Sequence, residues 1–110
     1  MAVVMNMRFE GVTSDQYDRV MEILDIESNP ADGFLAHVAG GVESGWRVLD
    51  IWQSEDHWNR FLQTRLMAAM QGAGIEGQPD VELYPLHNAV LADERDLAAI
   101  RAAGRSAAAS

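Results

Sequence analysis

The chain contains no cysteine, which excludes disulfide bonds, thiolate catalysis and zinc sites built on cysteine. It also contains no lysine, and its eight cationic residues are arginines that form no cluster along the sequence. With a net charge of −9 at pH 7, the protein lacks the dense positive surface that binds nucleic acids or anionic membranes. We therefore expect neither nucleic acid nor a membrane among its partners.

Long apolar runs are scarce as well. No stretch approaches the roughly 18 residues of a membrane span, and residues 1–8 have neither the basic start nor the long apolar core of a signal peptide. These features predict a cytoplasmic protein. At 110 residues, 48% of them hydrophobic, the chain suffices for one domain around a single core.

Two stretches nearly repeat each other. Residues 13–20 and 54–61 each give a hydroxyl, an acid, an aromatic, an arginine and an apolar residue in the same order. The leading hydroxyl is typical of a helix N-cap, and apolar residues follow at helical spacing. We predict one helix over about 14–26 and a second from Ser54 to the glycines at 72 and 74. Each helix lies between two apolar extended runs, which indicates a strand–helix–strand unit built twice.

Four extended runs are predicted as strands, at residues 2–9, 34–39, 46–52 and 81–90. Pro85 interrupts the last run and favours an edge position or a bulge. The order βαββαβ predicts an α+β, ferredoxin-like domain over residues 1–91, with a four-stranded antiparallel sheet and both helices on one face. Residues 92–110 are Ala-rich and are predicted to form a partly helical or disordered tail.

The uncovered face of this sheet needs a partner. The first, third and fourth predicted strands carry apolar residues on both faces, and apolar surface left in water costs about 25 cal/mol per Å². Two protomers that pair sheet to sheet would remove it. We therefore expect an isologous homodimer that closes into an α+β barrel.

The element order, the helix start at residues 54–58 and the strand at 83–88 make the chain similar to the dimeric α+β barrel superfamily, and within it to antibiotic-biosynthesis-monooxygenase-like domains. Its members include cofactor-independent oxygenases of polycyclic phenols, haem-degrading enzymes, lactone isomerases and stress-induced proteins. The resemblance implies a ligand site in each protomer, between the sheet and the helices. The asparagine and tryptophan of the oxygenases are matched in kind by Asn6 and Trp58. Their third group, an arginine or histidine, has no clear counterpart by motif.

Three further polar residues are candidates. Asp50 interrupts a central apolar strand, where an unpaired carboxylate is costly, so it is expected either to pair with Arg8 or Arg47 or to act as a base. His37 and His87 hold matching places in two strands and could meet across the dimer interface as a polar pair, an acid/base group or part of a metal site. The alternative is that ordinary hydrogen bonds satisfy each histidine. Two histidines without a placed carboxylate make a poor metal site, so no metal is predicted.

These observations predict a homodimer that binds a small apolar or aromatic molecule without a cofactor. On the oxygenase hypothesis Asn6 holds a phenolate or an oxygen species, Trp58 walls the substrate, and Asp50 or His87 handles a proton. The side chains expected to line the ligand pocket are Tyr17, His37, Trp52 and Phe61.

Two alternatives remain open at this point. One is a non-enzymatic dimer, stress-induced or partner-binding, in which the aromatic residues are only core. The other is a lactone isomerase, which would need a carboxylate or histidine in the same pocket. An open cavity beside Asn6 and Trp58 would favour ligand binding, whereas methionine and phenylalanine side chains filling that space would favour the non-enzymatic dimer.

Overall fold

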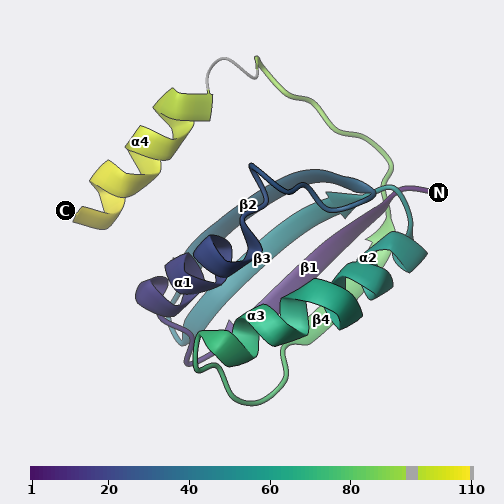
Figure 1. The fold of residues 1–110 in the computed structure, drawn as a ribbon. Coiled ribbons are helices and arrows are strands. Elements are labelled where there is room, and N and C mark those ends of the chain that lie inside the picture. Colours follow the sequence, from purple (N-terminus) through teal and green to yellow (C-terminus); the bar gives the residue numbers. More distant parts are fainter. Residues whose placement is uncertain (94–96, 110) are drawn as a thin grey trace.

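A computed structural model describes residues 1–93 and 97–109 of the chain (Figure 1). Its strands and helices follow one another in the predicted βαββαβ order, and a further helix comes after them. The elements are β1 (Val3–Glu10), α1 (Ser14–Leu24), β2 (Phe34–Val42), β3 (Gly45–Trp52), α2 (Glu55–Phe61), the π-helical segment η1 (Leu62–Leu66), α3 (Met67–Gly72), β4 (Asp80–Pro85) and α4 (Leu97–Ala109).

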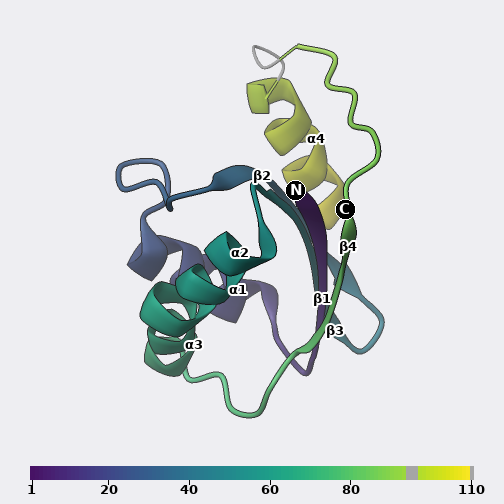
Figure 2. The same cartoon turned by 90° about the vertical axis from the view of Figure 1, so that its right-hand side faces the viewer.

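The four strands form one antiparallel sheet in the order β2-β3-β1-β4. All three helices α1, α2 and α3 cover the same face of this sheet (Figure 2). The arrangement confirms the predicted ferredoxin-like fold. It also confirms the edge position of the strand that contains Pro85, because β4 has β1 as its neighbour on one side only.

The first helix starts where the sequence predicts it. Thr13 caps the helix, since its hydroxyl accepts from the backbone N–H of Gln16 and the Gln16 side chain accepts from the backbone N–H of Thr13. The helix ends at Leu24 because Asp25 adopts a left-handed conformation, with φ 48°. The predicted end at residue 26 is therefore two residues too late.

The second predicted helix is continuous through α2, η1 and α3, with a π-helical turn in its middle. Ser54 caps its start by accepting from the backbone N–H of His57. Arg65, which lies within the π-helical turn, donates to the backbone oxygens of Leu24 and Asn29, at 2.7 and 2.8 Å. The second helix is thereby fastened to the end of α1.

The core lies between the sheet and these helices. Alternate residues of β1 point into it, and Met5 is fully buried. Trp52, Trp58 and Phe61 form an aromatic cluster at one end of the core, with ring centroids 4.9 to 6.2 Å apart. This cluster ties the last residue of β3 to the first turns of the second helix.

The opposite face of the sheet presents apolar side chains outward. Val38 is 63% exposed, and Leu49, its cross-strand partner, and Tyr84 are also exposed. We call the outward side chains of the middle of this face the outer sheet patch. By the strand registers it comprises Val4, Ala36, Val38, Leu49, Ile51 and Tyr84.

Two strand boundaries differ from the sequence prediction. The last strand ends at Pro85 instead of residue 90, because its pairing with β1 ends at Val3, with one further hydrogen bond from the Leu86 N–H to the Ala2 oxygen. β2 is longer than predicted and runs to Val42, where a two-residue turn at 43 and 44 leads into β3.

In the predicted tail, α4 stands apart from α1, α2 and α3 (Figures 1 and 2), and Arg101 forms an ion pair with Glu27 at 2.7 Å. Residues 94–96 and 110 of that tail lie outside the described residues. None of the helices in the described ranges has the length and apolar character needed to cross a bilayer.

Candidate functional site

Four side chains form a hydrogen-bonded chain on the helix-covered side of the sheet. The Tyr17 hydroxyl lies 2.5 Å from Nε2 of His37, and Nδ1 of His37 lies 2.6 Å from Oδ1 of Asp50. The other carboxylate oxygen of Asp50 accepts from the indole N–H of Trp52 at 3.1 Å. We call this set the Tyr17–His37–Asp50–Trp52 chain.

The backbone explains why these residues meet. His37 and Asp50 are direct cross-strand partners in β2 and β3, so their side chains point to the same face. Trp52 follows Asp50 by two residues and shares that face. Tyr17 lies in the first turn of α1, which passes over β2 and brings its hydroxyl to the His37 ring.

Proton positions in the chain follow from its electrostatics. The pKa of Tyr17 is raised from 10.0 to about 12, first by burial and then by the negative charge of Asp50. Tyr17 therefore keeps its proton at neutral pH and donates it to Nε2 of His37. Nδ1 of His37 then carries the imidazole proton and donates to Asp50. One buried carboxylate, 5% exposed, thus accepts two hydrogen bonds and orients the imidazole.

Trp46 extends the site toward the surface. Its ring packs against Tyr17, with 5.1 Å between centroids, and lies close over Gly41, where an added Cβ would stand 3.3 Å from the indole. The indole N–H of Trp46 is buried and has no hydrogen-bond partner in the described part of the chain. A buried donor without a partner costs about 1–3 kcal/mol.

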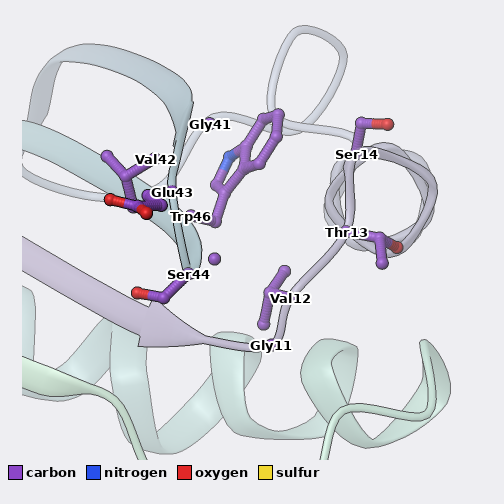
Figure 3. A pocket seen from close by; sticks show the side chains of 10 residues that line it. Gly11, Val12, Thr13, Ser14, Gly41, Val42, Glu43, Ser44 and Trp46 are labelled. Carbon is purple, nitrogen blue, oxygen red and sulfur yellow. The ribbon is translucent and has the colours of Figure 1, made fainter.

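An open pocket of about 370 Å³ lies against Trp46 (Figure 3). Its walls come from the turn between β1 and α1, residues 11–14, and from the β2–β3 hairpin, residues 41–46. Figure 3 shows the Trp46 indole between the hairpin and the start of α1. We call this space the Trp46 pocket.

No protein-family model matches the sequence, and no curated protein matches it either. Several solved structures do. A protein of unknown function from Nitrosomonas europaea, NE2512, is 20% identical with a TM-score of 0.64, covering 84% of this chain and 95% of its own. SnoaB, a cofactor-independent oxygenase from Streptomyces nogalater, is 12% identical with a TM-score of 0.58, covering 81% and 95%.

A third match is the ActVA-Orf6 monooxygenase from Streptomyces coelicolor, solved in complex with Nanaomycin D. It is 17% identical with a TM-score of 0.51, covering 84% of this chain and 92% of its own. This chain has the fold of the antibiotic-biosynthesis-monooxygenase-like proteins. At these identities the likeness concerns the ferredoxin-like fold, and the activity has to be argued from the residues.

In this monooxygenase-like fold, the predicted site residues divide into groups. Tyr17, His37, Asp50 and Trp52 come together in the hydrogen-bonded chain. Trp52 also joins the chain to Phe61 and Trp58 in the aromatic cluster.

The other candidates lie elsewhere. Trp58 is 2% exposed and belongs to the core, and neither it nor Asn6 lines the Trp46 pocket. Asn6 is paired with Leu49 and Glu82 on the outer face of the sheet. His87 is exposed in the segment after β4. Asn6 and Trp58 therefore lie on opposite sides of the sheet.

The expected partner of Asp50 was wrong. Arg8 and Arg47 are cross-strand partners of each other and point to the outer face, because they are an odd number of residues from the inward positions of their strands. Arg8 donates instead to the Ser44 hydroxyl at 3.1 Å. Asp50 is satisfied by an imidazole and an indole, not by a guanidinium.

Within the described residues, no group of three or more histidine, aspartate or glutamate side chains is arranged to hold a metal ion. The chemistry that the site offers is hydrogen bonding and proton transfer. A histidine oriented by a carboxylate is the usual arrangement of a general base.

Proposed function

We propose that the protein is a homodimer that binds a small phenolic compound at the Trp46 pocket and oxidises it as a cofactor-independent monooxygenase. The observation that carries the proposal is the Tyr17–His37–Asp50–Trp52 chain, which lies one aromatic ring behind a wall of that pocket. The fold shared with SnoaB and ActVA-Orf6 makes oxygenation the reaction class to test first.

The proposed reaction starts with proton transfer. Tyr17 does not line the Trp46 pocket, so the substrate hydroxyl has to reach it past the Trp46 ring. It then gives its proton to Tyr17 while Tyr17 passes its own to Nε2 of His37, and Asp50 stabilises the resulting imidazolium. His37 keeps 22% of its side chain exposed and Tyr17 is half-buried, which leaves the chain accessible from outside. Because the pKa of Tyr17 is about 12, a free tyrosinate is unfavourable, and we expect the two transfers to occur together.

The phenolate then reacts with molecular oxygen, which is the oxidant. One oxygen atom enters the ring and the other leaves as water, so a phenol and O₂ give a quinone and H₂O. Val12, Val42 and the Trp46 ring are the apolar part of the pocket lining that would withhold hydration from the phenolate. The unpartnered indole N–H of Trp46 would gain an acceptor in the substrate or product oxygen.

The outer sheet patch supports the homodimer. Val38 is 63% exposed in the isolated protomer, and each 100 Å² of apolar surface that a partner covers stabilises the pair by about 2.5 kcal/mol. One of the solved structures that match this chain is described as a dimeric ferredoxin-like protein, from Thermobifida fusca. The predicted meeting of His37 and His87 across such an interface does not fit this arrangement, because His37 points to the helix-covered face and both its ring nitrogens lie within hydrogen-bond distance of Tyr17 and Asp50.

The experiment is a panel of hydroxylated naphthalenes and anthracenes, tested for quenching of tryptophan fluorescence and for oxygen uptake. Tyr17→Phe removes the hydroxyl that relays the proton. Tyr84→Phe is the matched control, because it removes the same hydroxyl from the outer face of the sheet. We expect oxygen uptake in the wild type and in Tyr84→Phe, and a loss of at least about a hundredfold in Tyr17→Phe. Equal uptake in the two variants would refute the role of the chain.

A second function, a non-enzymatic partner-binding dimer, is favoured by one observation. The space beside Trp58 is filled by Trp52 and Phe61, in contrast to the open cavity that the oxygenase hypothesis expects there. If the panel gives neither quenching nor oxygen uptake while the protein is dimeric, this second function is the better account.

A further inference from the structure

The two helix caps that repeat in the sequence differ in their chemistry. At α1 the third residue after the cap is Gln16, whose side chain accepts from the backbone of Thr13. At α2 the same position is His57, and its Nδ1 lies 2.6 Å from the Ser54 hydroxyl. Since Ser54 Oγ already accepts from the His57 backbone N–H at 3.1 Å, its own proton points to the imidazole. The second cap is thus a serine hydroxyl paired with a base.

The far side of the His57 ring faces a carboxylate without a hydrogen bond to it. Its Nε2 lies 3.8 Å from Oδ2 of Asp32, an oxygen that also accepts from Arg60 at 3.4 Å. The ring rests directly on the backbone at Gly33, where φ is +81° and where any added Cβ would overlap the imidazole. The Ser54–His57 hydrogen bond is the pairing found in nucleophilic serine sites, and Asp32 lies beyond it, 3.8 Å from Nε2 and outside hydrogen-bond distance.

Ser54 also lines a second cavity, which is separate from the Trp46 pocket. The cavity measures about 420 Å³ and lies at the opposite end of the sheet, beside the end of β4. Val3, Leu83 and Pro85 supply an apolar wall, and Glu55 and Asp56 supply an acidic rim next to Ser54. Such a cavity fits a small ester with an apolar acyl group and no negative charge. An acidic ester would be repelled by the rim.

We propose that Ser54 is the nucleophile of an esterase-type site, with His57 as its general base and Asp32 as a positioning residue. Ser54 Oγ bonds to the acyl carbon while its proton passes to Nδ1 of His57. The bond from the acyl carbon to the alcohol oxygen breaks, and that oxygen takes the proton from His57. Water then attacks the acyl carbon and gives a proton to His57, which returns it to Ser54 Oγ as the acyl–serine bond breaks. The products are one alcohol and one carboxylic acid.

The test is acetylation by p-nitrophenyl acetate, followed by intact mass and peptide mapping. Because the chain has no lysine and no cysteine, the side chains that most often take background acetylation are absent, and peptide mapping separates the α-amino group of Met1 from Ser54. We expect one acetyl group on Ser54 of the folded wild-type protein. The key variant is His57→Gln, which gives α2 the cap residue that α1 already has and so preserves the helix start. It should slow acetylation of Ser54 by about a hundredfold or more.

Two further variants complete the experiment. Ser54→Asn keeps a capping side chain but removes the nucleophile, and it should abolish the label, whereas Thr13→Asn at the matched cap of α1 should leave it unchanged. Asp32→Asn should slow acetylation, and Asp32→Glu should restore part of the rate, which a purely structural role would not produce. Absence of both p-nitrophenolate release and an acetyl group on Ser54 in the wild type, or equal rates in wild type and His57→Gln, would overturn the proposal.

Discussion

Replacing Asp50 with asparagine tests the hydrogen-bonded chain at its buried carboxylate. Asp50 is 5% exposed and accepts from Nδ1 of His37 at 2.6 Å and from the indole N–H of Trp52 at 3.1 Å. Asparagine has the same shape but only one acceptor oxygen, and its NH₂ group would face the donor on the other side. One buried N–H therefore loses its partner, and the remaining hydrogen bond loses its charge.

The magnitude follows from those two losses. A hydrogen bond to a charged acceptor contributes about 1.5–3 kcal/mol, and a buried donor left unpaired costs about 1–3 kcal/mol. Since His37 can rotate toward solvent and recover part of this cost, we expect Asp50→Asn to lower the free energy of unfolding by about 2–4 kcal/mol. At about 4 °C per kcal/mol, the melting temperature should fall by roughly 8–16 °C.

The assay combines guanidinium unfolding with an alkaline absorbance titration of tyrosinate. The negative charge of Asp50 is the second cause, after burial, of the raised pKa of Tyr17. Asp50→Asn should therefore lower that pKa from about 12 while leaving it above 10.0, because burial persists. A loss of stability below about 0.5 kcal/mol, together with an unchanged Tyr17 titration, would refute the reasoning.

Three other predictions concern different parts of the molecule. Folding raises the pKa of Tyr17 from 10.0 to about 12, so the stability that the protonated Tyr17 contributes is complete below pH 10 and is lost as the pH rises toward 12. Urea unfolding at about pH 9 and about pH 11 should show this fall in the free energy of unfolding, and the fall should be smaller in Tyr17→Phe. Val38→Asp, at a 63% exposed position of the outer sheet patch, should shift sedimentation equilibrium from dimer to monomer, whereas Met67→Asp, 47% exposed on α3, should leave the dimer intact; equal effects would argue against pairing through the sheet. Trp46→Phe removes an unpartnered buried N–H, so the free energy of unfolding should stay the same or rise. The affinity for phenols should fall about fivefold, measured by calorimetric titration against the wild type.

Local signals in the sequence were enough to predict most of the fold. The capping residues Thr13 and Ser54 located both helix starts, and alternating apolar residues located the four strands. The errors occurred at element ends that depend on backbone conformation. Asp25 ends α1 by taking a left-handed conformation, and β4 ends at Pro85 because its pairing with β1 ends at Val3, where the sequence pattern suggested a longer strand.

The site was harder to predict because it depends on strand register. His37 and Asp50 were each recognised as candidates, but their pairing requires the hairpin turn to contain two residues, 43 and 44. The sequence prediction ended one strand at residue 39 and began the next at 46, and a connection of that length hides the pairing. Trp46 could be assigned to the same face as Asp50 by alternation along β3. The orphaned indole N–H and the pocket beside it are properties of packing and have no signature in the sequence.

The most direct test of the proposed function is the stoichiometry of oxygen consumed and quinone formed from a phenol that the protein binds, in the wild type and in His37→Gln. We predict one O₂ consumed for each quinone formed in the wild type. In His37→Gln we predict intact phenol binding with turnover reduced at least about a hundredfold, because the base that receives the proton is gone. Turnover at the wild-type rate in His37→Gln, or binding of phenols without any oxygen uptake in the wild type, would contradict the account.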